Sequence, residues 1–212
     1  VALAVTTGVL STVGTAELLL RTTRSNIEAL LLANDANNRQ GTAALLATKL
    51  DILQTTLAAT ARATTPEMWQ DHAALERHLR QASSANALFD VLLASDAQGK
   101  MLVRLVNGKP SDDLPDIADR PYFQQAIRSD QLVISEPVMG RASKEPLVIL
   151  AMATPHRDGQ PTGIVGGSLP LDSAGLFSNI GQGDLHDGSR TLVMNRAGTV
   201  MAHPDPARLL GK

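Results

Sequence analysis

Residues 88–106 read LFDVLLASDAQGKMLVRLV. Two apolar runs, 88–94 and 101–106, flank the segment DAQG at 96–99, which has the composition of a tight turn. Short apolar runs separated by a turn predict a β-hairpin. Before residue 85 the apolar residues recur at helical spacing instead, so we expect a sheet to begin there.

Upstream of the hairpin, the sequence predicts a long helix followed by a shorter one. Residues 25–63 contain no proline and one glycine, and four leucines recur at intervals of 4, 3 and 4: Leu46, Leu50, Leu53 and Leu57. This spacing marks one helix face, which lies either in the core of the chain or in a dimer seam. Thr64, Pro66 and Glu67 predict that the second helix starts here, and it ends near residue 84.

The first twenty residues carry one charged side chain, Glu17, among apolar residues and threonines. Their length fits the outer part of a transmembrane helix, and their composition also fits an amphipathic helix that packs on a partner. The sequence begins at Val1 and stops just after a strand-like pattern, so we expect a fragment of a larger protein.

Downstream of the hairpin, the sequence predicts an antiparallel meander with one inserted helix. The helix is expected at 121–129 and the extended segments at 132–138, 146–154 and 163–171. Helices followed by such a sheet make an α+β fold. Residues 191–202, TLVMNRAGTVMA, repeat the run–turn–run pattern and predict the start of a second, truncated module. The expected domains are the N-terminal helices at 1–84, a complete module at 85–180 and the truncated module at 181–212.

Composition excludes several classes of function. The chain has 19 basic and 21 acidic residues, a net charge of −2, and only five aromatic side chains (one Trp, one Tyr and three Phe), so nucleic acid is not an expected partner. The absence of cysteine removes thiol nucleophiles and thiolate metal sites. His72 and Glu76 share a helix face, but two ligands do not make a zinc site. We expect neither a metal nor a cofactor.

Catalysis is not expected within this chain either. The string GGSLP at 166–170 ends in proline, whereas a nucleophile elbow requires Gly-x-Ser-x-Gly. The glycines of GIVGGS at 163–168 also lack the lysine that follows a phosphate-binding loop. They are expected to permit close packing of a strand.

Five short strings resemble, in their order along the chain, the first module of a double Cache sensor domain. They are DRPYF at 119–123, ISEP at 134–137, PLVI at 146–149, DG at 158–159 and GIVG at 163–166. The string GTVMAHPDP at 198–206 is similar to the start of the second, membrane-proximal module of that family.

The resemblance implies an extracytoplasmic sensing region of a bacterial receptor, anchored in the inner membrane with its sensor domain in the periplasm. The membrane-distal, PAS-like module would hold the ligand, and the long helix would carry the signal within a homodimer. Output domains of the family are chemoreceptor, histidine kinase or cyclic di-GMP modules, and any catalytic output would lie outside this chain. A ligand-free module for structure or dimerisation is the alternative.

The resemblance also implies where a ligand would bind. Family members that bind amino acids use an Arg-x-Trp-Tyr string, a Tyr-x-Asp pair and a further Asp. At these positions the chain has RPYF at 120–123, VMG at 138–140 and Ser168. The acids that would hold an ammonium group are missing there, so a small organic anion is favoured over an amino acid.

Arg120 would anchor the anion through its planar fork, with Tyr122 as an orienting donor and Phe123 as a wall. Ser168 would add a hydroxyl, and Arg141 would add positive potential. Each arginine also has an alternative role that does not involve a ligand. Arg120 would then be a structural residue beside two core aromatics, and Arg141 would belong to a solvated turn.

Overall fold

The computed structural model describes residues 41, 43–154, 156–157, 160–171, 193–194, 198–202 and 208–211. The chain divides into two compact units, Val1–Ala47 and Thr48–Lys212. In the first unit, residues 41 and 43–47 are helical. The predicted end of a membrane span at 1–20 and the predicted domain boundary at 180/181 lie outside the described residues. Among the residues that are described, none of the helices combines the length and apolarity needed to span a bilayer.

In the second unit, residues 48–62 form a long helix, which confirms the described part of that prediction. Leu53 and Leu57 on this helix are fully buried. Their burial assigns this part of the leucine face to the core of the chain. Leu50, one turn earlier, is half-buried.

The second helix starts later than the sequence predicts. Pro66 and Glu67 lead into a short 3-10 helix, η1 (Met68–Gln70), and α2 (His72–Gln81) follows. Asp71 sets this start, because its Oδ1 accepts hydrogen bonds from the backbone N–H groups of residues 73 and 74 at 3.0 and 3.1 Å. An aspartate at this position satisfies amides that otherwise have no helical partner. A third helix, α3 (Ser83–Leu88), includes Leu88, the first residue of the apolar run expected at 88–94, and the strand itself starts at Val91.

Seven strands form one antiparallel sheet in the order β3-β2-β1-β9-β6-β4, with β5 also paired to β6. Their bounds are β1 Val91–Asp96, β2 Met101–Val106, β3 Lys109–Pro110, β4 Val133–Ile134, β5 Val138–Met139, β6 Pro146–Ala153 and β9 Gly163–Pro170. The hairpin β1–β2 and the α+β class are confirmed. The meander is wrong, because β9, the last strand of this sheet in sequence, lies between β1 and β6. Residues 163–169 of β9 are all buried, which explains its central place.

Two further strand pairs lie in the described segments. β7 (His156–Arg157) pairs with β8 (Gln160–Pro161), and β10 (Val193–Met194) pairs with β11 (Val200–Ala202). The second pair confirms the hairpin predicted from the repeated pattern at 191–202.

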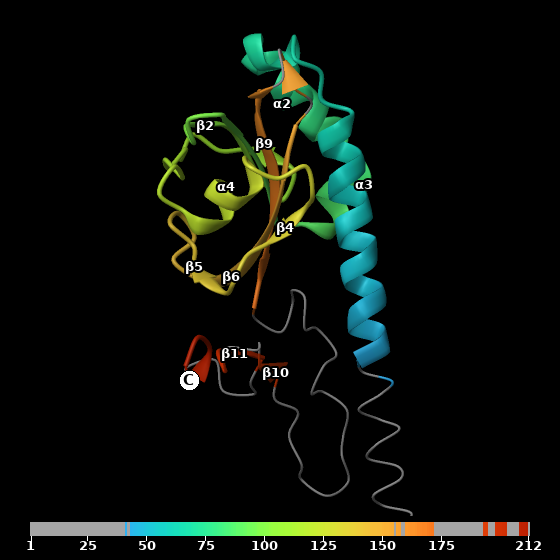
Figure 1. Cartoon of the computed structure of the whole chain (residues 1–212), viewed down its shortest axis with the longest axis vertical. Coiled ribbons are helices and arrows are strands. Elements are labelled where there is room, and N and C mark those ends of the chain that lie inside the picture. The colour runs from blue at the N-terminus through green and yellow to red at the C-terminus, as the bar shows by residue number, and fades with distance from the viewer. Residues whose placement is uncertain are drawn as a thin grey trace, which may run out of the picture. The chain divides into compact units, whose positions relative to one another are not determined.

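The large sheet separates α4 (Pro121–Ala126) on one side from the long helix, α2 and α3 on the other (Figure 1). Successive side chains of a strand point to opposite faces. On the α4 side, Leu93 and Ile149 belong to a buried cluster with Tyr122 and Phe123 of α4. Their strand neighbours Leu92, Val148 and Leu150 are also buried, so both faces of the sheet are packed.

A bulge in the β1–β2 hairpin changes which side chains share a face. Ala94 pairs with Val103, but Ser95 pairs with Met101, so Leu102 is the extra residue. Met101 therefore faces the same side as Arg104, rather than the side of Val103. Simple alternation along the sequence does not show this grouping.

Gly167 marks the closest packing between β9 and the helical layer. A Cβ added there would overlap the ring of Phe89, which follows α3 and is 2% exposed. A ring held in a dense core cannot move aside cheaply. The role predicted for the glycines of β9, close strand packing, is therefore the role that Gly167 has.

We predict that Gly167→Ala lowers the free energy of unfolding by about 1–3 kcal/mol, because the methyl group overpacks the Phe89 contact. Urea denaturation measures the change. Gly41→Ala is the matched control, since a Cβ at this helical position meets no atom within 4 Å and is expected to leave stability unchanged or raise it by up to about 1 kcal/mol. Equal stability of Gly167→Ala and the wild type would contradict the packing assignment.

Candidate ligand-binding site

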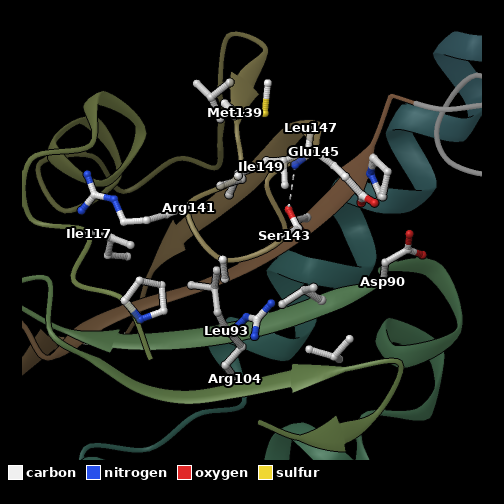
Figure 2. A pocket seen from close by; sticks show the side chains of 18 of the residues that line it. Asp90, Leu93, Arg104, Ile117, Met139, Arg141, Ser143, Glu145, Leu147 and Ile149 are labelled. Atoms are coloured by element: carbon white, nitrogen blue, oxygen red, sulfur yellow. Dashed lines mark hydrogen bonds between the residues drawn. The ribbon is translucent and has the colours of Figure 1, made fainter. Parts of the chain in front are cut away.

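A cavity of about 220 Å³ opens on the α4 side of the sheet. Its lining comes from β1, β2, β6 and β9, from the loop before α4, from the start of α4, and from the turn between β5 and β6 (Figure 2). The volume is below the roughly 300–1,000 Å³ of sites for drug-sized ligands. The cavity therefore suits a molecule of metabolite size.

Four of the five side chains predicted for the ligand site line this cavity: Arg120, Tyr122, Arg141 and Ser168. They come from the loop before α4, from α4 itself, from the β5–β6 turn and from β9. The segment 138–140, aligned above with the Tyr-x-Asp pair, lines it as well. Phe123 does not line the cavity; it is buried in the adjoining core cluster, 5% exposed.

Arg120 is held at the N-terminal end of α4. Its extended backbone forms the N-cap, and Pro121 occupies the first helical position, where the fixed φ of proline favours helix initiation. The Arg120 N–H donates to the carbonyl of Ile117 at 2.9 Å. Its Nη2 donates to the carbonyl of Met139 at 3.4 Å, so the half-buried side chain extends from α4 toward β5.

The turn of the β1–β2 hairpin positions the loop that carries Arg120. Gly99 has a φ of +88°, and a Cβ there would come within 2.5 Å of the Ala118 Cα. The Gly99 carbonyl accepts a hydrogen bond from the Ile117 N–H at 2.9 Å. Only a glycine combines this conformation with so close an approach. The turn recognised in the sequence therefore also supports the loop that carries Arg120.

Tyr122 is the single tyrosine of the chain and is 4% exposed. Burial raises the pKa of its hydroxyl to about 12, although the positive charges of Arg120 and Arg141 act in the opposite direction. Within the part of the chain that the structure describes, the hydroxyl makes no hydrogen bond. A neutral phenol of this kind can donate a hydrogen bond to an anion in the cavity.

Arg141 ties the β5–β6 turn to the loop before α4. Its Nη2 donates to Asp119 Oδ2 at 2.7 Å, and its Nη1 donates to the Asp116 carbonyl at 2.6 Å. The hydrogen bond between the two side chains raises the pKa of Arg141 and lowers that of Asp119. Because its charge is already paired, Arg141 serves mainly as a brace of the cavity wall.

Sequence reasoning missed three charged residues of the lining: Asp90, Arg104 and Glu145. Arg104 interrupts the apolar run of β2, which is a signal in itself, but its face follows from the bulge. Asp90 and Glu145 are exposed and lie at one side of the cavity in Figure 2. Acids are therefore present on the lining, at positions other than those of the family pattern.

No family model matches the sequence. A curated relative, the methyl-accepting chemotaxis protein PctB of Pseudomonas aeruginosa, is 31% identical over 106 residues, which are 48% of this chain and 16% of that protein. The alignment with this receptor thus spans about a sixth of its length.

Solved structures give a longer alignment. The ligand-binding domain of the amino acid chemoreceptor PctC of Pseudomonas aeruginosa PAO1, in complex with GABA, has a TM-score of 0.64 at 21% identity and covers 82% of this chain and 75% of its own. A domain of a sensory box/GGDEF family protein from Vibrio parahaemolyticus has a TM-score of 0.64 at 17% identity, with coverages of 83% and 74%. At these identities the likeness shows the fold.

We predict that ultraviolet titration of the phenol places the pKa of Tyr122 near 12 in the folded chain and near 10 in the unfolded chain. The raised pKa stabilises the fold fully below about pH 10, and this contribution is lost as the pH rises toward 12. The chain unfolded in denaturant is the control. A folded-state midpoint near 10 would contradict the burial of the hydroxyl.

Proposed function

We propose that this chain, which has the Cache sensor fold of chemoreceptor ligand-binding domains, binds a small organic anion as the sensor domain of a transmembrane receptor. The observation that carries the proposal is the meeting of Arg120, Tyr122 and Ser168, distant in sequence, on one cavity of metabolite size. The expected membrane-distal module at 85–180 contains all three. The sensor itself performs no reaction, and the output belongs to another part of the receptor.

The chemistry of the three side chains suits a carboxylate. The Arg120 guanidinium offers a planar pair of donors that matches the two carboxylate oxygens. The Tyr122 phenol stays protonated at physiological pH and adds a third donor. Ser168 on β9 is 5% exposed and adds a hydroxyl at the sheet side. An anion held by such groups exchanges its hydration for charge-assisted hydrogen bonds.

An amino acid or an amino-carboxylate is the second candidate ligand. The PctC domain was solved with GABA, and the acids Asp90 and Glu145 line the cavity of this chain. These acids could hold an ammonium group, but they are exposed, whereas Tyr122 and Ser168 are buried. The buried part of the cavity therefore favours the anionic group of a ligand as the main determinant of binding.

The relatives and the order of elements support the receptor context of the proposal. A periplasmic sensor anchored in the inner membrane would continue into a chemoreceptor, kinase or cyclic di-GMP output domain. The long helix packs on the face of the sheet opposite to the cavity, and it would transmit a change of shape within a homodimer. Ligand must bind one arrangement better than the other for this transmission to occur. The two faces are adjacent at β9, where Ser168 lines the cavity and Gly167 contacts Phe89.

Isothermal titration of the chain with butyrate, succinate, GABA and L-isoleucine tests the proposal. We predict that at least one carboxylate binds and that Arg120→Ala weakens its binding about tenfold or more, as expected for losing charged hydrogen bonds. Arg128→Ala is the matched control, because Arg128 is exposed and does not line the cavity. It is expected to bind like the wild type.

The alternative outcomes are distinct. If Arg120→Ala binds the carboxylate as well as the wild type does, Arg120 is a structural residue and its assignment as the anchor of the anion is wrong. If neither these compounds nor a wider set of small metabolites binds the wild type, the ligand-free module for dimerisation becomes the better account.

A further inference from the structure

Arg104 is a largely buried but not fully enclosed cation in the wall of the proposed ligand site. It lies in β2, opposite Leu93 of β1, and its side chain is 12% exposed. Because of the bulge at Leu102, it faces the α4 side of the sheet and lines the cavity. Figure 2 shows its guanidinium directed from β2 into the cavity.

The chain compensates this charge only in part. Arg104 Nη1 donates to Ser111 Oγ at 2.9 Å, and its nearest carboxylate, Asp113 Oδ2, is 3.9 Å away on a side chain that is 62% exposed. A pair with so exposed a partner contributes little. A guanidinium this far removed from solvent requires more compensation than one hydroxyl gives. An anion in the cavity would add the compensation that Ser111 and the exposed Asp113 leave incomplete.

The other charged residues of the lining do not supply that anion. Asp90 and Glu145 are exposed, so their charges are screened by solvent. No hydrogen bond or ion pair joins either of them to Arg104 among the described residues. The inner part of the cavity therefore contains a cation and hydroxyl groups.

We propose that the ligand carries two anionic groups, one bound by Arg120 and the other by Arg104. This inference rests on the proposed function, since it assumes that the cavity binds a small anion. The two arginines come from different walls, the N-terminal end of α4 and strand β2, and both line the same 220 Å³ cavity. A short dicarboxylate matches this arrangement in charge and size, with Ser168 and the Tyr122 hydroxyl as further donors.

The test compares matched pairs of ligands by isothermal titration: malonate with propionate, succinate with butyrate, and glutarate with valerate. For at least one pair, the dicarboxylate is expected to bind the wild-type chain about tenfold or more tightly than the monocarboxylate. Arg104→Met is expected to weaken dicarboxylate binding much more than monocarboxylate binding, so that the preference disappears. Arg120→Ala is expected to weaken both members of the pair, and Arg128→Met is the control.

The outcomes separate this inference from the proposed function. If monocarboxylates or GABA bind and no dicarboxylate binds more tightly, the inference of a second anionic group is wrong, while the sensor proposal stands. An unchanged dicarboxylate preference in Arg104→Met would likewise overturn the role of Arg104. If the methionine variant does not fold, Arg104→Lys replaces it; this variant keeps the charge but loses the planar fork, so the preference should fall without disappearing. If no carboxylate binds at all, the proposed function fails and this inference fails with it.

Discussion

Strand β9 is the constraint on which the arrangement of this chain depends. Its residues 163–168 pair with β1 on one side, its residues 164–170 pair with β6 on the other, and both of its faces are buried. One face must fit the helical layer, where Gly167 leaves room for the Phe89 ring. The other must leave room for a cavity, which the small side chain of Ser168 lines. Small residues at the centre of the sheet thus meet two packing requirements at once.

Under the proposed function, the same strand would provide a physical route from a bound ligand to the helical layer. Ser168 lies opposite Val91 of β1 and Ile149 of β6, which also line the cavity. Gly167, one residue away, points to the opposite face and touches the helical layer. Dense packing transmits small displacements, because a filled core has few voids to absorb them. A shift of β9 upon binding would therefore reach the helices without a separate pathway.

The sequence predicted the elements better than their arrangement. The hairpin within 88–106 and the helix expected at 121–129 follow from local patterns, although α4 already ends at Ala126. Four of the five predicted site residues meet on one cavity. The predicted start of α2 at Pro66 and Glu67 is wrong, because the helix is capped by Asp71 and begins after it. The position of β9 depends on pairing with strands that are distant in the sequence. Local periodicity cannot predict such pairing.

Arg104 shows the same limit within the site, because a bulge of one residue reverses which side chains share a face.

The most direct test of the central claim, that Arg120 anchors an anion, is a crystal structure of the chain with a bound ligand. We predict a carboxylate within hydrogen-bond distance of both the Arg120 guanidinium and the Tyr122 hydroxyl. A ligand held in this cavity with no contact to Arg120, or bound elsewhere in the domain, would contradict the account.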